Sequence, residues 1–265
     1  MHLLAGQIKS YRRFVPPSTL TLTGERTLPG IAPENYWYRR HEAAYTAIAP
    51  FCRGAVVVDA GCGEGYGAAL LHREGAGSAL GLELDAAVAV HAHARYPAVS
   101  VARADLQHLP LAAGAVDVVV SSQVVEHLTD QPQFISECSR ALRPAGTLIL
   151  TTPNRFTFSP GQAAPLNPFH TRELCADELI ELVTPHFEVT RLLGVSHGAR
   201  LRRWERRHGS LVDAQLGSSP DSWPDRLRAF VRSVSAADFA ISPDAVDSAL
   251  DLLLIAVRRP TRRAS

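Results

Sequence analysis

Short apolar runs and longer segments with helical spacing alternate along most of the chain. Runs rich in valine, isoleucine and leucine predict strands, and segments with apolar positions three or four residues apart predict helices. The predicted strands begin at Ala55 and then cover 79–84, 99–102, 116–120, 147–151, 187–193 and 249–257. The predicted helices cover 34–49, 67–74, 86–96, 131–142 and 173–184. This alternation predicts an α/β fold with a doubly wound, mostly parallel, seven-stranded sheet and helices on both faces.

The same pattern divides the chain into segments of one elaborated domain. Residues 1–50 form a proline-containing arm and a lid helix that ends at Pro50, because proline lacks the amide that a helix interior needs. Residues 51–193 form the core, and 249–265 form the last strand and a tail. Between them, 194–248 is rich in arginine, glycine, serine and proline and has no strand-like run. We expect this segment to be an insertion on the side of the sheet that receives a second ligand.

The first strand leads directly into a glycine-rich turn, Val56-Val57-Val58-Asp59-Ala60-Gly61-Cys62-Gly63-Glu64-Gly65-Tyr66-Gly67. Glycine lets the backbone turn sharply and approach a ligand, and the next helix presents free amide groups. The spacing G-x-G-x-G differs from the G-x-G-x-x-G of dinucleotide-binding turns. The turn predicts a nucleotide-like ligand, and an NAD-dependent oxidoreductase is an alternative that the spacing does not favour.

Acidic residues follow the next strands at informative positions. Glu83 ends the second strand about 20 residues beyond the turn, where an acid binds ribose hydroxyls in nucleotide-binding units. Asp105 follows the third strand, and the fourth leads into residues 121–128. Because the carboxyl ends of parallel strands meet in one crevice, we expect these residues to line a single site.

Four segments in this order carry a family resemblance: VVDAGCGEGYG, LGLELD, ADLQHLPLAAGAVDVVVSSQVVEHL and LRPAGTLILTTPN. Over residues 56–154 the chain resembles the class I S-adenosylmethionine-dependent methyltransferases. The resemblance implies a Rossmann-like fold, S-adenosylmethionine as cofactor and S-adenosylhomocysteine as product. The cofactor-binding residues that it implies are Asp59, Gly61, Cys62, Gly63, Glu83, Leu84, Asp105, Leu106 and Gln123.

Several of these residues have a specific implied role. Asp59 is expected beside the methionine amino group, or it holds the turn through backbone amides. Gly61 and Gly63 let the backbone pass under the cofactor. Glu83 is implied to bind the ribose, and Asp105 to accept the adenine amino group.

The arm ahead of the sheet combines aromatic residues and arginines in Thr23–Gly30 and Glu34–Glu42. It resembles a lid over the cofactor, in which Tyr36 stacks or forms a hydrogen bond and Arg40 pairs with the methionine carboxylate. An amphipathic helix whose aromatic stripe packs on the core is the alternative.

Glu126 and His127 follow the fourth strand, near the expected position of the reacting methyl group. Methyl transfer to a hydroxyl needs alignment and removal of a proton, and an imidazole titrates near neutral pH. His127 is therefore a candidate base, and His170, after the fifth strand, is its competitor. Histidines and acids lack metal-ligand spacing along the chain, so no metal site is predicted. Spacing along the chain does not reveal a metal site whose ligands come from distant segments.

The segments TPNRFTFSPG, NPFHTREL and HGARLRRWERRHGSLVDAQL look similar to an actinobacterial subgroup linked to methylglucose lipopolysaccharide, hence to polysaccharide O-methylation. This likeness implies a sugar or oligosaccharide hydroxyl as acceptor. Trp204, Trp223, Tyr66 and Phe169 could supply aromatic platforms, and the arginines of 200–207 could bind hydroxyls or an anionic group. The alternatives are a small-molecule natural product as acceptor, a solvated arginine face, and a non-catalytic protein that binds S-adenosylmethionine.

The net charge, the length of the apolar runs and the cysteine pattern of the chain are consistent with an enzyme. The formal net charge is +1, which gives no electrostatic reason to expect a nucleic acid partner. Apolar runs are too short for a membrane span. The four cysteines have no C-x-x-C spacing, and the amino terminus lacks a signal-peptide pattern, so we expect a cytoplasmic protein.

Overall fold

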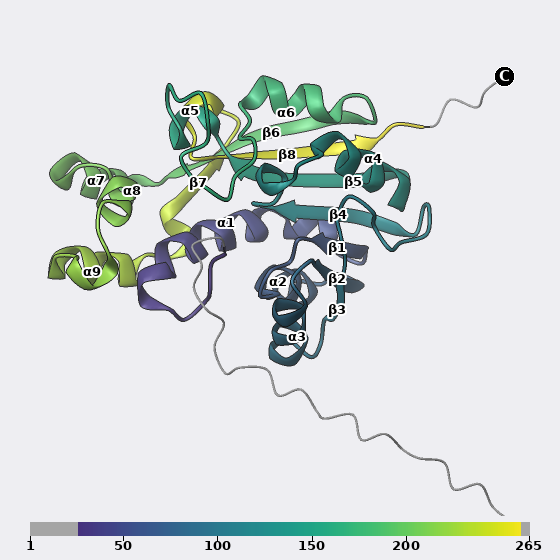
Figure 1. Ribbon diagram of the computed structural model, residues 1–265, viewed down its shortest axis with the longest axis horizontal. Coiled ribbons are helices and arrows are strands. Elements are labelled where there is room, and N and C mark those ends of the chain that lie inside the picture. Colours follow the sequence, from purple (N-terminus) through teal and green to yellow (C-terminus); the bar gives the residue numbers. More distant parts are fainter. Residues whose placement is uncertain (1–25, 261–265) are drawn as a thin grey trace, which may run out of the picture.

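The computed structural model describes residues 26–260 (Figure 1). The remaining parts of the predicted arm and tail, 1–25 and 261–265, lie outside the described residues, and Thr23, Gly24 and Glu25 are among them. Within the described range, eight strands form one sheet in the order β3-β2-β1-β4-β5-β8-β6-β7. The strands are β1 (Val56–Ala60), β2 (Ser78–Glu83), β3 (Ser100–Arg103), β4 (Val116–Ser122), β5 (Leu142–Pro153), β6 (Phe187–His197), β7 (Phe239–Ser242) and β8 (Asp251–Arg258).

Strands β1 to β5 pair in parallel, and β8 lies antiparallel between β5 and β6. Strand β7 pairs antiparallel with β6 at the edge. The order can be followed in Figure 1 from β6 at the top to β3 at the bottom. The Rossmann-like, mostly parallel sheet that the sequence predicts is thus confirmed, with one strand more than expected.

Helices and short 3-10 helices connect the strands. The α-helices are α1 (Asn35–Cys52), α2 (Tyr66–Arg73), α3 (Ala86–Arg95), α4 (Gln131–Ala141), α5 (Arg155–Phe158), α6 (Ala176–Val183), α7 (Ala199–His208), α8 (Leu211–Leu216) and α9 (Asp225–Ser233). The 3-10 helices are η1 (Ala32–Glu34), η2 (Val125–His127), η3 (Pro220–Ser222), η4 (Ala236–Asp238) and η5 (Val246–Ser248).

Apolar side chains alternate between the two faces of the central strands, as the period of two in a strand requires. On β5, Ile149 packs on one side with α1, α2 and the helices of the insertion. Its neighbours Leu148 and Leu150 pack on the other side with α4 and α6. Both faces of the sheet are therefore buried, which is why these strands read as continuous apolar runs.

The predicted insertion is largely helical and packs against the amino-terminal helix. Helices α7, α8 and α9 gather beside α1 in Figure 1. The Asn35 side-chain amide donates hydrogen bonds to the carbonyls of Val231 and Val234, both at 2.9 Å. Strand β7 also belongs to this segment, which the sequence analysis expected to contain no strand.

Several element boundaries differ from the prediction by a few residues, and strands β5 and β6 are longer than expected. Two of the differences in helices have identifiable reasons. Helix α1 continues past Pro50 to Cys52, since the buried side chains of Ala49 and Cys52 anchor its last turn against the core. The helix expected from residue 173 begins at Ala176, where Cys175 is the N-cap residue and the Glu178 side chain accepts a hydrogen bond from the Cys175 amide.

The strand order reverses beside β1, whose neighbours are β2 and β4. Ligands of open α/β sheets bind outside the carboxyl ends of the strands at such a reversal. The glycine-rich turn follows β1, and residues 123–128 follow β4. The topology therefore predicts a ligand site between these two segments.

Two further expectations can be compared with the described range. No helix between residues 26 and 260 is long and apolar enough to cross a membrane. The four cysteines, Cys52, Cys62, Cys138 and Cys175, are all buried free thiols.

Candidate functional site

A cavity of about 610 Å³ opens at the carboxyl ends of β1, β2 and β4. Helix α1 and the segment between α5 and α6 complete its walls. Its volume lies within the range of small-molecule sites, about 300–1,000 Å³. The site residues inferred from the sequence all line it except Asp59 and Tyr36. Those that line it are Arg40, Gly61, Cys62, Gly63, Glu83, Leu84, Asp105, Leu106, Gln123, Glu126, His127 and His170.

The glycine-rich turn forms the floor of the cavity. Gly61 has a φ of +84°, and a Cβ there would lie 2.4 Å from a methyl carbon of Val124, so only glycine fits. Gly63 also has a positive φ, of +53°, and nothing lies within 4 Å of the position of a Cβ. The turn therefore approaches the segment after β4 closely at Gly61 and leaves open space for a ligand above Gly63.

Glu83 connects this turn to the end of β2. One carboxylate oxygen accepts a hydrogen bond from the Gly63 amide at 3.0 Å, and the other accepts one from the Asp85 amide at 2.9 Å. Each carboxylate oxygen has a second lone pair. The side chain is thus fixed in direction by the backbone and can still accept hydrogen bonds from a pair of hydroxyl groups.

Asp105 and Leu106, which follow β3, also line the cavity. One oxygen of Asp105 accepts a hydrogen bond from the Gln107 amide at 2.9 Å, while the side chain as a whole is 51% exposed. The Leu106 side chain is buried. The pair offers an acceptor beside an apolar surface, an arrangement suited to the edge and face of an adenine ring.

Asp59 lies beneath the turn and does not line the cavity. Its carboxylate accepts hydrogen bonds from the Tyr45 hydroxyl at 3.0 and 3.2 Å. Burial raises the pKa of Asp59 to about 7. These hydrogen bonds join Asp59 to α1, and both roles inferred from the sequence, contact with a methionine amino group and holding of the turn through backbone amides, stay predictions.

One face of α1 covers the cavity, and it includes Arg40, as expected from the sequence, but not Tyr36. Trp37, His41 and Tyr45 line the cavity at helical spacing. Tyr36 instead lies fully buried, with its hydroxyl 2.6 Å from His197 Nε2. As placed, Tyr36 cannot stack on a ligand in the cavity, because its ring is enclosed by the core and the insertion.

Arg40 lines the cavity and is also part of a buried ion pair. Its guanidinium forms a salt bridge with Asp251 at the start of β8 and donates a hydrogen bond to the Leu250 carbonyl. Both charged side chains are 3% exposed. Since Asp251 already neutralises this guanidinium, pairing with a methionine carboxylate would need Arg40 to be shared between two anions.

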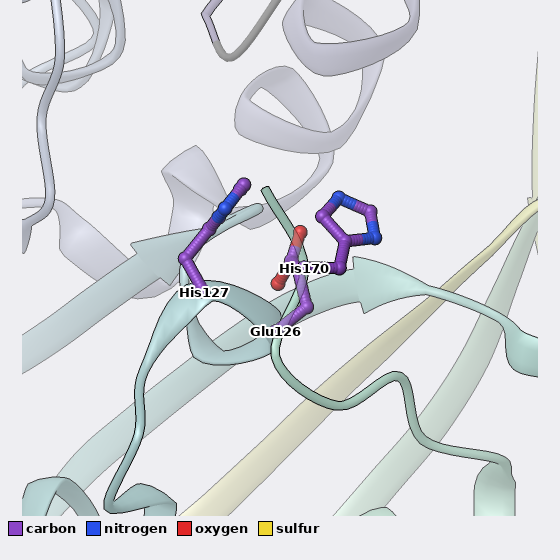
Figure 2. Close-up of side chains that lie close together, drawn as sticks. All are labelled: Glu126, His127 and His170. Carbon is purple, nitrogen blue, oxygen red and sulfur yellow. The ribbon is translucent and has the colours of Figure 1, made fainter. Parts of the chain in front are cut away.

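Three further residues of the cavity wall, Glu126, His127 and His170, lie close to one another (Figure 2). Glu126 is 1% exposed, and one of its oxygens accepts a hydrogen bond from the Thr152 hydroxyl at 3.0 Å. Burial raises the pKa of Glu126 to about 8, and the negative charges of Asp251 and Glu173 add to this effect.

The two imidazole rings lie nearly perpendicular, with 4.8 Å between their centroids. His127 Nδ1 is 2.9 Å from the Phe169 carbonyl oxygen, and His170 Nδ1 is 2.7 Å from a Glu173 carboxylate oxygen. Burial lowers the pKa of His170. The resulting end of the cavity holds two imidazoles and a carboxylate within reach of one small group.

Most of the aromatic and basic groups considered for acceptor binding lie elsewhere. Trp204 stacks on Phe230, and Trp223 is buried with its indole N–H bonded to the Ser218 carbonyl. Phe169 and the arginines of α7 do not line the cavity, whereas Tyr66 does. The tryptophans pack the insertion together instead of facing the cavity.

Further lining residues escaped the sequence analysis. Glu34, Trp37, His41 and Tyr45 are three or four residues apart, so helical periodicity could have grouped them on one face. Asn167 and Leu216 carry no such signal, because only the tertiary fold brings the segment after α5 and the end of α8 to the cavity.

Comparison with known proteins shows that this chain is similar to methyltransferases. A family model described as a methyltransferase domain matches residues 58–150. The chain is 52% identical over 249 residues to a probable S-adenosylmethionine-dependent methyltransferase of Mycolicibacterium smegmatis, covering 91% of this chain and 96% of that one. It is 48% identical to one of Mycobacterium tuberculosis, covering 91% of each chain.

A solved methyltransferase in complex with the Haloferax volcanii Trm112 activator has a TM-score of 0.60 at 19% identity, covering 86% of this chain and 92% of that chain. That likeness concerns the fold alone. The chain belongs to the S-adenosylmethionine-dependent methyltransferases, and its cofactor is S-adenosylmethionine.

The residues of the cavity fit this cofactor. The open space above Gly63 leaves room for a ligand, and the anchored carboxylate of Glu83 and the acceptor at Asp105 would suit the ribose hydroxyls and the adenine amino group that the sequence assigns to them. The cofactor supplies a methyl group on a positively charged sulfur.

Proposed function

We propose that this methyltransferase transfers the methyl group to a hydroxyl of a sugar or oligosaccharide. The observation that carries the proposal is the group of Glu126, His127 and His170 in the wall of the cavity. A hydroxyl is a weak nucleophile at neutral pH, and it needs help to lose its proton as its oxygen attacks the methyl carbon. An imidazole nitrogen with a free lone pair can supply that help.

The tautomer of His127 supports direct contact with the acceptor hydroxyl. Its Nδ1 faces a carbonyl oxygen, which only accepts hydrogen bonds, so the ring proton belongs on Nδ1. Nε2 then carries a lone pair, and this residue lines the cavity. His170 has the same tautomer, since Glu173 accepts from its Nδ1, but its Nε2 already faces the Asn167 amide at 3.1 Å. His127 is therefore the first candidate to contact the hydroxyl.

The reaction replaces an O–H bond by an O–C bond. The acceptor oxygen donates an electron pair to the methyl carbon, the carbon–sulfur electron pair stays on sulfur, and the proton leaves the acceptor. The chain contributes by aligning the two reactants and excluding water, which is worth several orders of magnitude in rate. Leu128, Phe158 and Leu216 form apolar parts of the wall that would exclude water there.

The character of the lining supports a carbohydrate acceptor over a purely apolar one. Uncharged polar side chains that both donate and accept hydrogen bonds line part of the cavity, and a sugar presents several hydroxyls around its ring to such groups. These residues are Thr27, Gln107, Ser122, Gln123, Thr129 and Asn167. The three segments that look similar to enzymes of polysaccharide methylation supply Phe158, Asn167, His170 and Leu216 to the lining of the cavity.

A calorimetric experiment tests this proposal. The protein saturated with S-adenosylhomocysteine is titrated with glucose-based and mannose-based oligosaccharides, and in parallel with a hydroxylated aromatic compound of similar size. The proposal predicts saturable binding of an oligosaccharide that is lost when Asn167 is replaced by alanine. Binding of the aromatic compound with no oligosaccharide bound would favour a small-molecule natural product as acceptor.

A further inference from the structure

Two histidines and a glutamate from distant parts of the chain converge at the acceptor end of the cavity. Glu126 and His127 belong to η2, and His170 follows more than 40 residues later, in the segment before α6. One ligand atom from each of the three side chains lies within 4.8 Å of the other two. Figure 2 shows the Glu126 carboxylate between the two imidazole rings.

Both imidazoles are oriented as metal ligands usually are. Metal-binding histidines donate their second ring N–H to a carbonyl or carboxylate, which fixes the tautomer and the direction of the ring. His127 does so to the Phe169 carbonyl and His170 to the Glu173 carboxylate. The His170 and Glu173 side chains are 4% and 1% exposed. Both Nε2 atoms therefore keep lone pairs.

Glu126 supplies an independent indication that a ligand belongs here. Its Oε1 is buried and has no hydrogen-bond partner among residues 26–260. A buried acceptor without a partner destabilises the folded state, and more so when it is charged. The neighbouring charges that act on Glu126 are those of Asp251 and Glu173, both acidic. A cation beside Oε1 would satisfy the oxygen and offset this negative charge.

We propose that Glu126, His127 and His170 bind a divalent transition-metal cation, with its remaining coordination positions open to the cavity. Two imidazole nitrogens and one carboxylate oxygen suit Mn²⁺, Co²⁺ or Zn²⁺, whereas Mg²⁺ and Ca²⁺ prefer oxygen ligands. Bond lengths of about 2.1 Å place neighbouring ligand atoms about 3.0–3.4 Å apart. The three side chains must therefore draw together slightly, and His170 Nε2 must exchange its contact with Asn167 for the metal.

The catalytic consequence rests on the proposed function. An acceptor hydroxyl that reaches an open coordination position would lose its proton more easily, because the cation stabilises the negative charge on oxygen. In this form His127 holds the metal, and the proton passes to water in the cavity. Binding of the metal itself does not depend on which acceptor is methylated.

The experiment measures metal binding without using activity. The full chain, freed of metal by a chelator, is titrated with MnCl₂ and with CoCl₂ by calorimetry, and the Co²⁺ complex is examined by visible absorption. We expect one ion per chain and an absorption spectrum typical of nitrogen and oxygen ligands. The Glu126→Gln and His127→Ala variants should each bind at least about 10-fold more weakly.

Matched controls separate this result from adventitious binding and from misfolding. His93→Ala removes an exposed histidine of α3 and should bind both ions as the wild type does. Glu173→Gln changes only the partner of His170 and should weaken binding by about 10- to 100-fold. All variants should bind S-adenosylhomocysteine, which shows that they are folded. Absence of Mn²⁺ and Co²⁺ binding, or binding that Glu126→Gln and His127→Ala leave unchanged, would overturn the proposal even if methyl transfer is observed.

Discussion

The Gly63 amide donates a hydrogen bond to the Glu83 carboxylate at 3.0 Å, which joins the glycine-rich turn to the end of the neighbouring strand. The contact makes Glu83 part of the cavity floor as well as a candidate ligand of ribose hydroxyls. Loss of this side chain should therefore disturb both the ligand and the turn beneath it.

Replacement of Glu83 by alanine should weaken binding of S-adenosylhomocysteine by about 10- to 100-fold, because hydrogen bonds to a charged group contribute about 1.5–3 kcal/mol. Calorimetry measures this change directly. Glu188→Ala, which removes an exposed acid of β6, is the matched control and should bind as the wild type does. Equal affinities for the wild type and Glu83→Ala would remove Glu83 from the cofactor site.

His127→Ala should leave the affinity for S-adenosylhomocysteine within about threefold, but lower turnover by about 100-fold or more, the range expected when the group that activates a hydroxyl is lost. Steady-state kinetics and calorimetry on the same preparation separate the two effects.

A chelator distinguishes the two ways in which His127 could act. If the residue holds a metal, chelation of the wild type should lower turnover and added Mn²⁺ should restore it. If His127 accepts the proton directly, chelation should change nothing. Full turnover by His127→Ala would exclude both roles.

The sequence predicted the central sheet and most of the cavity, because the relevant residues stand at strand ends that the topology must bring together. The valines of β1 and the acid at Glu83 are local signals of this kind. The short strand β7 was not predicted, because its four residues lie in a segment rich in arginine, glycine, serine and proline.

Two features could not be read from local patterns. The rotation of α1 depends on which stripe the core buries, and the fold encloses Tyr36 while Trp37, Arg40 and His41 line the cavity. The cluster of Glu126, His127 and His170 depends on a long-range contact, in which the Thr171 amide donates a hydrogen bond to the Glu126 carbonyl at 2.7 Å. The spacing of residues along the chain does not predict that contact.

Tyr36→Phe should destabilise the protein by about 1–3 kcal/mol without changing its affinity for S-adenosylhomocysteine. Glu205 holds the proton of His197 on Nδ1, so Nε2 accepts from the Tyr36 hydroxyl and would lose its partner in the core. Denaturant unfolding measures the free energy, and Tyr38→Phe, at a half-buried position on α1, is the control. If Tyr36→Phe greatly lowered the affinity for S-adenosylhomocysteine and left the free energy of unfolding unchanged, Tyr36 would be a cofactor-binding residue after all.

The buried carboxyl of Asp59 should make stability depend on pH. Its pKa in the folded state is about 7, above the ordinary value of 3.8. Below about pH 4 the group is protonated in both states, and its contribution to stability is fully present. As pH rises from about 4 to 7, the unfolded state loses the proton first, so stability falls by up to about 1.4 kcal/mol per pH unit.

Asp59→Asn removes this ionisation while it keeps the shape of the side chain and an acceptor for Tyr45. The difference in unfolding free energy between wild type and Asp59→Asn, measured by denaturant at pH 5 and pH 7, should change in favour of the variant as pH rises. A difference that stays constant with pH would show that Asp59 ionises normally in the folded protein.

The most direct measurement is transfer of an isotope-labelled methyl group from S-adenosylmethionine to a panel of glucose-based and mannose-based oligosaccharides, with the product analysed by mass spectrometry. A sugar O-methyltransferase should yield a labelled methyl ether on a sugar hydroxyl, with transfer strongly reduced in His127→Ala. Transfer only to an amine or a carboxyl group, or binding of the cofactor with no transfer to any hydroxyl compound, would contradict the proposed function.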